Sequence, residues 1–179
     1  ADVIAFGPGL GQSPWAQDIY ALLAQDKRPS VWDADALNLL AAAPAPGERR
    51  IITPHPGEAA ALLGLEVAEV QSDRRAAIAR LHRLCGGVAV LKGAGTLVTA
   101  GSSAPWLCTA GNPGMAAPGM GDVLTGIIAA LLAQGLSAED AAAIGVEVHA
   151  QAGDRAAMAG ERGMLASDLL AELRAVINP

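Results

Sequence analysis

Short apolar runs and amphipathic stretches alternate along this chain. Runs typical of buried strands occupy residues 2–6, 30–33, 50–53, 87–91, 96–99 and 106–109. Apolar residues at helical spacing predict helices that start at Ser13-Pro14, pass through 36–40 and 60–63, and cover 72–84, 122–134, 138–158 and 165–177. Strands that alternate with helices favour an α/β fold whose mostly parallel central sheet carries helices on both faces.

Length and composition narrow the class of protein. A chain of 179 residues predicts a single domain over residues 1–179. Apolar residues make up 52% and charged residues 17%, which argues against intrinsic disorder. The net charge is −6, and Lys27 and Lys92 are the two lysines. We therefore expect neither a nucleic-acid partner nor a polybasic membrane surface.

The apolar stretches, the cysteines and the first residues of the chain bear on where the protein is located in the cell. The longest uncharged apolar stretch, residues 123–134, is too short to span a bilayer. Cys85 and Cys108 cannot form a disulfide framework, so we expect two buried thiols. No basic segment precedes the first apolar run, which predicts a cytoplasmic protein without a signal peptide. Because a strand begins almost directly after Ala1, we also expect this chain to be an excerpt of a longer polypeptide.

Unusual residues follow five of the predicted strands. Ligands of such folds collect at the carboxyl ends of the strands, so five such segments predict one shared cleft. The segments are Gly7-Pro8-Gly9-Leu10-Gly11, Asp33-Ala34-Asp35, Thr53-Pro54-His55-Pro56-Gly57-Glu58, Lys92-Gly93-Ala94-Gly95-Thr96 and residues 111–122.

The segment 111–122 carries the most chemistry. Gly119 and Gly121 let the backbone approach a ligand closely, and they precede an amphipathic helix. Free amides of a first helical turn favour an anion. Asp122 lies in the same place and can act as a base toward a hydroxyl held beside that anion. The arrangement suits phosphoryl transfer, although Asp122 as a simple helix cap is the structural alternative.

The other segments supply candidate ligands with open alternatives. Lys92 could lie near nucleotide phosphates with the Thr96 hydroxyl beside it, or could be a surface lysine. His55 stands between two prolines that stiffen its backbone, which suits a ligand contact as well as a structural histidine. Asp33 and Asp35 could contact a substrate or Mg²⁺, or Asp35 could cap a helix. Neither a Walker loop nor a Rossmann G-x-G-x-x-G sequence is present.

Taken in order, these segments resemble the ATP- or ADP-dependent NAD(P)H-hydrate dehydratase family of the ribokinase-like superfamily. GMGDVLTG by itself is similar to the wider kinase superfamily, whereas TPHPGE together with GNPGM is specific to the dehydratases. The matching stretches are GPGLG at 7–11, DADALNLL at 33–40, TPHPGEAA at 53–60, LKGAGT at 91–96, GNPGMA at 111–116 and GMGDVLTG at 119–126. The resemblance also takes in Val148-His149-Ala150 through Gly153-Asp154 and extends to the C-terminal helix.

The resemblance implies a ribokinase-like fold and a repair reaction. The (S)-epimer of hydrated NADH or NADPH, which carries a hydroxyl at C6 of its damaged ring, would be restored to NAD(P)H at the expense of ADP or ATP, with Mg²⁺ bridging the phosphates. Asp122 would be the catalytic base. Gly9, Gly11, His55 and Asp122 would contact the hydrated dinucleotide, and the nucleotide would lie at Lys92, Gly93, Ala94, Gly95, Thr96, Gly119 and Gly121.

The resemblance also implies partners and leaves rival functions open. Family members often form homo-oligomers, carry a further N-terminal portion, and can be fused to an upstream NAD(P)H-hydrate epimerase domain. One rival is a kinase for a vitamin precursor, of the hydroxyethylthiazole or hydroxymethylpyrimidine type. The other rival is a nucleotide-binding module without catalysis.

Overall fold

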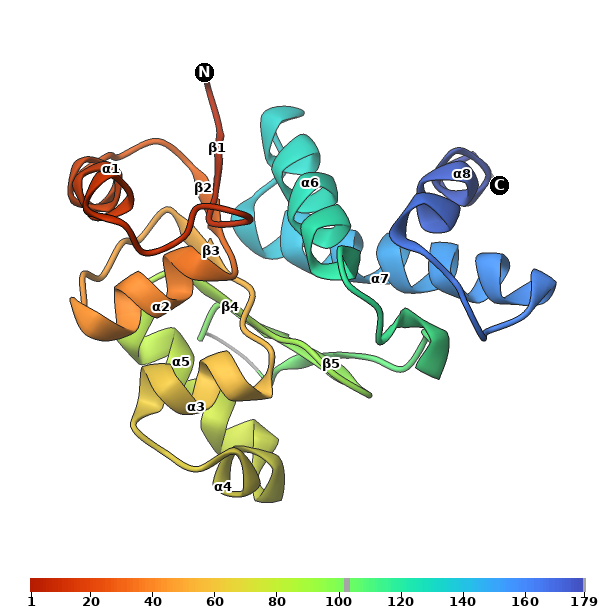
Figure 1. Cartoon of the computed structure of the whole chain (residues 1–179), viewed down its shortest axis with the longest axis horizontal. Helices are drawn as coiled ribbons and strands as arrows, with labels where there is room; N and C mark the ends of the chain where they lie inside the picture. The colour runs from red at the N-terminus through yellow and green to blue at the C-terminus, as the bar shows by residue number, and fades with distance from the viewer. Residues whose placement is uncertain (102–103, 179) are drawn as a thin grey trace.

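One six-stranded sheet organises the protein, whose computed structural model describes residues 1–101 and 104–178 (Figure 1). Its strands stand in sequence order: β1 (Ile4–Phe6), β2 (Ser30–Trp32), β3 (Arg50–Ile52), β4 (Val88–Leu91), β5 (Thr96–Thr99) and β6 (Trp106–Cys108). β1 to β4 are parallel, whereas β5 pairs antiparallel with both β4 and β6. The predicted mostly parallel sheet is therefore confirmed, and so is the predicted hairpin of residues 87–91 with 96–99.

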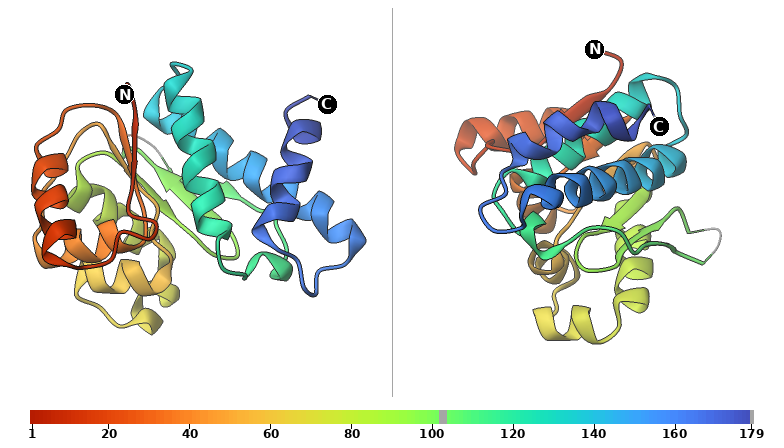
Figure 2. Two further views of the ribbon diagram at one scale, coloured as in Figure 1. Left: turned by 45° about the horizontal axis from the view of Figure 1, so that its top comes forward. Right: turned by 90° about the vertical axis from the view of Figure 1, so that its right-hand side faces the viewer.

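Helices cover both faces of the sheet (Figures 1 and 2). One face carries α1 (Pro14–Ala24), α2 (Asp35–Ala42), α3 (Pro56–Leu63), α4 (Val67–Ser72) and α5 (Arg74–Cys85). The other face carries α6 (Met120–Ala133) and α7 (Ala138–Ala156), and α8 (Ala166–Val176) packs against α7. The 3₁₀ turns η1 (Pro113–Met115) and η2 (Ala157–Ala159) flank this second layer.

Alternation along the strands divides the core between these two layers. In β2, Trp32 packs among α1 to α5 while its neighbour Val31 packs against α6 and α7, and both are fully buried. Trp32 meets Phe6 and Tyr20 edge to face, with ring centroids 5.2 and 5.5 Å apart. β2, β3 and β4 are buried at every position, which is typical of parallel strands that helices cover on both faces.

Side chains cap the starts of α1, α3, α5 and α7, whereas α2, α6 and α8 begin without a side-chain cap. The Ser13 hydroxyl caps α1, with Pro14 as its first residue, and Ser137 caps α7 in the same way. α4 was not predicted, because it has only six residues and its N-cap is Glu66 rather than a typical capping residue. Within the described residues, no helix is both long enough and apolar enough to cross a bilayer.

Candidate active site

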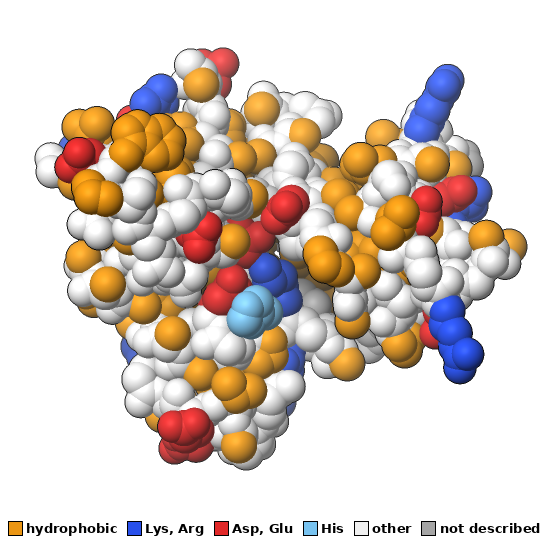
Figure 3. Space-filling view, viewed as in Figure 1, with side chains coloured by type: hydrophobic (Ala, Val, Ile, Leu, Met, Phe, Trp, Pro, Cys, Tyr) orange, Lys and Arg blue, Asp and Glu red, His pale blue; other side chains and the backbone are white. Residues whose placement is uncertain are grey.

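The carboxyl edge of the parallel strands gathers all five segments that the sequence singled out. β1 to β4 end at this edge, and so does β6, since it runs opposite to β5. The turn between β4 and β5 lies there for the same reason. Figure 3 shows acidic, basic and histidine side chains gathered around a hollow at the centre of this face of the molecule.

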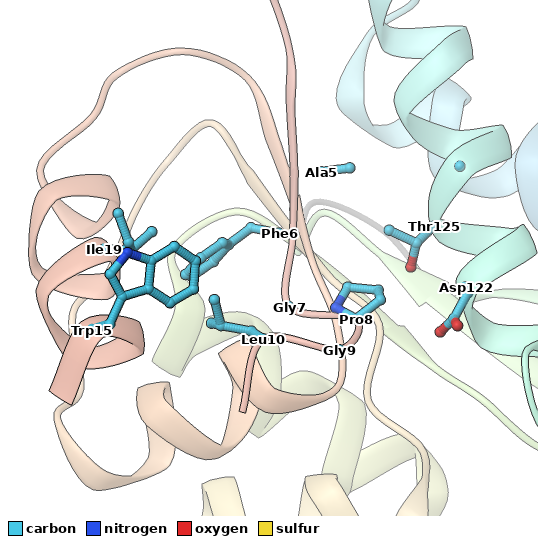
Figure 4. Close-up of a pocket in the computed structure, with 11 residues that line it drawn as sticks. Ala5, Phe6, Gly7, Pro8, Gly9, Leu10, Trp15, Ile19, Asp122 and Thr125 are labelled. Carbon is cyan, nitrogen blue, oxygen red and sulfur yellow. The ribbon is translucent and has the colours of Figure 1, made fainter. Parts of the chain in front are cut away.

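A cleft of about 510 Å³ opens between the loop after β1 and the first turns of α6. The Asp122 carboxylate is exposed in it and faces the glycine-containing loop (Figure 4). Pro8 and Gly9 form the opposite wall, so the predicted proximity of Gly9 and Asp122 is observed. The cleft is lined by Ala5, Phe6, Gly7, Pro8, Gly9, Leu10, Trp15, Ile19, Asp122, Thr125 and Gly126.

The N-terminus of α6 presents unpaired amides at the same place. Gly119 is the N-cap with φ of 85°, a conformation that glycine adopts without strain, and it offers no side chain to cap the helix. The N–H groups of Gly121 and Asp122 have no acceptor among the described residues. A helix end with unpaired amides can bind an anion, and the anion site that the sequence predicts at Gly119 and Gly121 stays a prediction.

Beneath this helix end lies an ion pair between the partly buried Lys92 and the buried Asp33. The Lys92 ammonium donates to Asp33 Oδ1 at 2.6 Å, and the Thr125 hydroxyl donates to Asp33 Oδ2 at 3.0 Å. A Cβ atom on Gly121 would lie 3.2 Å from both Asp33 Oδ2 and Lys92 Nζ. Lys92 is thus not a free surface lysine, and Asp33, with a side chain only 2% exposed, is a buried partner rather than a ligand in the open cleft.

His55 has a structural role that the sequence left open. Its Nδ1 accepts hydrogen bonds from the N–H groups of Gly57 and Glu58, which caps α3. Glu58 in turn accepts from the His55 N–H at 2.7 Å and lies 3.8 Å from Lys92 Nζ. The imidazole remains exposed at the carboxyl edge, and its predicted contact with the hydrated dinucleotide stays a prediction.

The turn from Gly93 to Thr96 follows Lys92 and is held from outside the cleft. Arg74 Nη2 donates to the carbonyl oxygens of Leu91, Lys92 and Gly95 at 3.1, 3.3 and 3.1 Å. Burial lowers the pKa of Arg74 from its ordinary value. Gly93 and Ala94 are exposed, so their backbone is accessible to a ligand.

The loop before α6 is fixed by α7. The Asp154 carboxylate accepts hydrogen bonds from the Gly111 N–H and the Asn112 side-chain amide, both at 3.0 Å. His149 donates from Nε2 to the carbonyl oxygen of Met120, the first residue of α6, at 2.9 Å. Burial, together with the positive charge of Lys92, lowers the pKa of His149 to about 4, so the imidazole is neutral near pH 7.

Sequence reasoning missed Arg74, Thr125 and His149. Thr125 carried a usable signal, because it follows Asp122 by three residues and therefore lies near it on the helix surface. Arg74 carried no such signal, since it acts on a segment that is distant in sequence. His149 lies in a stretch that resembles the family, but its contact with Met120, 29 residues away, could not be read from that stretch.

The donor set suits a magnesium ion that arrives with phosphates. Among the described residues, no group of three or more His, Cys, Asp or Glu side chains could hold a metal ion. Mg²⁺ in nucleotide sites is typically held by phosphate oxygens, waters and one or two carboxylates. Asp122, which is exposed in the cleft, is the carboxylate that could supply part of that share. Cys85 and Cys108 are both buried and free, as predicted, and burial raises the pKa of Cys108 to about 11.

The sheet order and the uncapped helix end beside its carboxyl edge define a ribokinase-like α/β protein. The sequence profile of the NAD(P)H-hydrate dehydratase family matches residues 1–175, so the chain belongs to this family. It is 54% identical to the bifunctional NAD(P)H-hydrate repair enzyme Nnr of Escherichia coli K12, over 100% of this chain and 35% of that protein.

Two further comparisons agree on the family. The chain is 41% identical to the ADP-dependent (S)-NAD(P)H-hydrate dehydratase of Neisseria meningitidis, over 85% of this chain and 53% of that protein. The ADP/ATP-dependent NAD(P)H-hydrate dehydratase of Bacillus subtilis, crystallised with ATP and Mg²⁺, superposes with a TM-score of 0.88 at 30% identity, covering 99% of this chain and 66% of that chain. The chain thus spans about a third of the length of the E. coli relative.

Proposed function

We propose that residues 1–179 are the nucleotide-dependent dehydratase part of an NAD(P)H-hydrate repair enzyme. The reaction converts the (S)-epimer of hydrated NADH or NADPH to NAD(P)H and spends ADP or ATP. The observation that carries the proposal is the position of Asp122. Its carboxylate is exposed in the cleft beside the unpaired amides of α6 and across from the loop that contains Gly9.

The chemistry follows from what these groups can do. Asp122 accepts the proton of the C6 hydroxyl as the hydroxyl oxygen bonds to the transferred phosphorus and the nucleotide leaves. The Gly121 and Asp122 amides stabilise the charge on the phosphoryl oxygens. The C6–O bond then breaks with phosphate as the leaving group, and a proton leaves the adjacent ring carbon to the released phosphate or to water, which restores the double bond.

The remaining groups position the two ligands. Lys92 and the turn from Gly93 to Thr96 hold the nucleotide, while Gly9, Gly11 and His55 contact the hydrated dinucleotide. Mg²⁺ bound with the phosphates would neutralise part of their charge, and the cleft carboxylate that could help to hold it is Asp122. We expect an NAD(P)H-hydrate epimerase domain in the same polypeptide, because a relative described as bifunctional is nearly three times as long as this chain. The homo-oligomer that the family resemblance implies stays a prediction.

Removal of the Asp122 carboxylate tests this function. The full-length protein is incubated with hydrated NADH, Mg²⁺ and either ADP or ATP, and NADH is followed by absorbance. Loss of a general base lowers turnover by about 10²- to 10⁴-fold, so Asp122→Asn should lose activity while nucleotide binding is largely retained.

Asp18→Asn, at an exposed position of α1, is the matched control and should keep normal turnover. Near-normal turnover in Asp122→Asn would remove Asp122 from the role of base. Phosphorylation of a thiazole or pyrimidine alcohol by the wild-type protein, without repair of hydrated NADH, would contradict the dehydratase function itself.

A further inference from the structure

The turn between β2 and α2 is held in an unfavourable conformation. Ala34 has φ of 48° and ψ of −122°, and it is the one residue other than glycine with positive φ among those described. Hydrogen bonds fix the turn from both sides, because Asp33 N–H donates to Phe6 O at 3.0 Å and Leu37 N–H donates to Ala34 O at 2.9 Å. Strain of this kind persists only where the surrounding structure imposes it, and it is frequent at functional sites.

The two carboxylates that flank Ala34 have different partners on opposite sides of the cleft. Asp33 accepts from Lys92 at the end of β4 and from Thr125 in α6. Asp35 accepts from the Gly11 N–H at 2.8 Å, which fixes the loop that follows β1. That loop also closes on itself, since Leu10 N–H donates to Gly7 O at 3.0 Å. One strained turn therefore contacts both the helix that carries Asp122 and the loop that faces it.

Each of the two carboxylates holds one wall of the cleft in place: Asp33 contacts α6, and Asp35 contacts the loop after β1. Thr125 and Asp122 are three residues apart in α6, so a fixed Thr125 sets the position of Asp122. The Asp33 carboxylate is almost completely buried, and loss of its partners would leave a charge without compensation. At the other wall, Gly11 is exposed and has φ of 71°, so the Asp35 carboxylate is the described contact that restrains its amide.

We propose that Asp33 and Asp35 are positioning residues that set the separation between the two walls of the cleft. Asp33 holds the side of Lys92 and α6, and Asp35 holds the glycine loop. The assignment of these walls to the nucleotide and to the hydrated dinucleotide rests on the function proposed above. The contacts themselves do not depend on it, so they can be tested separately.

The first test removes the bond to the glycine loop. Asp35→Ala deletes the acceptor of the Gly11 amide, whereas Asp35→Asn keeps a carbonyl oxygen at the same place. Amide hydrogen exchange of the full-length protein, measured without substrate, should become faster at residues 9–12 in Asp35→Ala and stay near wild type in Asp35→Asn. Asp35→Ala should also raise KM for the hydrated dinucleotide by about tenfold or more, with a much smaller change in KM for the nucleotide.

The second test acts on the other wall. Thr125→Val removes the hydroxyl that donates to Asp33, and Thr125→Ser retains it. We expect kcat to fall by about tenfold in Thr125→Val and to recover in Thr125→Ser, with little change in KM for the hydrated dinucleotide. Asp18→Asn is the control for both tests.

Several results would overturn the proposal. Unchanged exchange at residues 9–12 in Asp35→Ala would show that the carboxylate does not restrain the loop. Equal changes of KM in Asp35→Ala and Asp35→Asn would show that the hydrogen bond to Gly11 does not position the loop. Equal losses of kcat in Thr125→Val and Thr125→Ser would show that the hydrogen bond to Asp33 does not position α6. Should the wild-type protein fail to repair hydrated NADH, the exchange experiment still decides the positioning role, because it needs no substrate.

Discussion

At the scale of single residues, Ala34 has a strained backbone conformation that positions its two neighbours, Asp33 and Asp35. Its positive φ brings Cβ into conflict with the backbone, which typically costs about 1–3 kcal/mol for a residue other than glycine. The conformation places Asp33 in the interior and Asp35 beside Gly11. The strain is therefore confined to Ala34, while the two carboxylates that it positions contact both walls of the cleft.

Substitutions at this residue should separate strain from chain entropy. Glycine relieves the strain but adds flexibility to the unfolded chain, which costs about 0.5–1 kcal/mol. Ala34→Gly should therefore raise the free energy of unfolding by about 1 kcal/mol, whereas Ala34→Val should lower it by about 2 kcal/mol, since a branched side chain tolerates positive φ least. Urea unfolding of the full-length variants measures both. A destabilised Ala34→Gly protein would show that the turn is not strained.

At the scale of elements, the first turn of α6 depends on the absence of a side chain at Gly121. Alanine at this position would favour the helix by up to about 1 kcal/mol. Its Cβ would, however, lie 3.2 Å from both Asp33 Oδ2 and Lys92 Nζ, so this ion pair would have to shift by a few tenths of an ångström. The gain in helix propensity and the displacement of the ion pair should largely cancel in the free energy of unfolding, whereas turnover should fall.

We expect Gly121→Ala to keep its free energy of unfolding within about 1 kcal/mol of wild type and to lose about tenfold or more in turnover, because small displacements of catalytic groups are costly. Gly126→Ala in the same helix is a matched control for stability, since a Cβ there meets no atom within 4 Å. It should raise the free energy of unfolding by about 0.5–1 kcal/mol. Wild-type turnover in Gly121→Ala would contradict the tight packing described here.

The elements also show how far the sequence alone could lead. Strand ends, helix starts and the order of the five segments were predictable, because capping residues, glycines and apolar runs are local signals. The contacts beneath the site were not, since Thr125 and Asp33 are 92 residues apart and Lys92 and Asp33 are 59 residues apart. Those contacts depend on the strand order and on side-chain packing. The sequence placed Asp33 near a ligand, and only the packed structure shows that its carboxylate is buried.

At the scale of the whole molecule, the partly buried His149 makes the stability of the fold depend on pH. His149 joins α7 to the first turn of α6, and its pKa is lowered to about 4, first by burial and then by Lys92. The unfolded chain binds a proton at this imidazole near pH 6.5, whereas the folded protein does not until about pH 4. Stability from this group is therefore fully present above the unfolded pKa and is lost as the pH falls toward 4.

The size of this effect gives a measurable prediction. Between pH 7 and pH 5, His149 should lower the free energy of unfolding by about 2 kcal/mol, because each unit of pKa difference corresponds to about 1.4 kcal/mol. His149→Gln keeps a donor for the Met120 carbonyl oxygen but cannot take up a proton. Urea unfolding of the full-length protein gives the free energy of unfolding at both pH values. Its decrease from pH 7 to pH 5 should be about 2 kcal/mol smaller in His149→Gln than in wild type. An equal loss in both proteins would mean that His149 is not the group that couples this helix pair to acid.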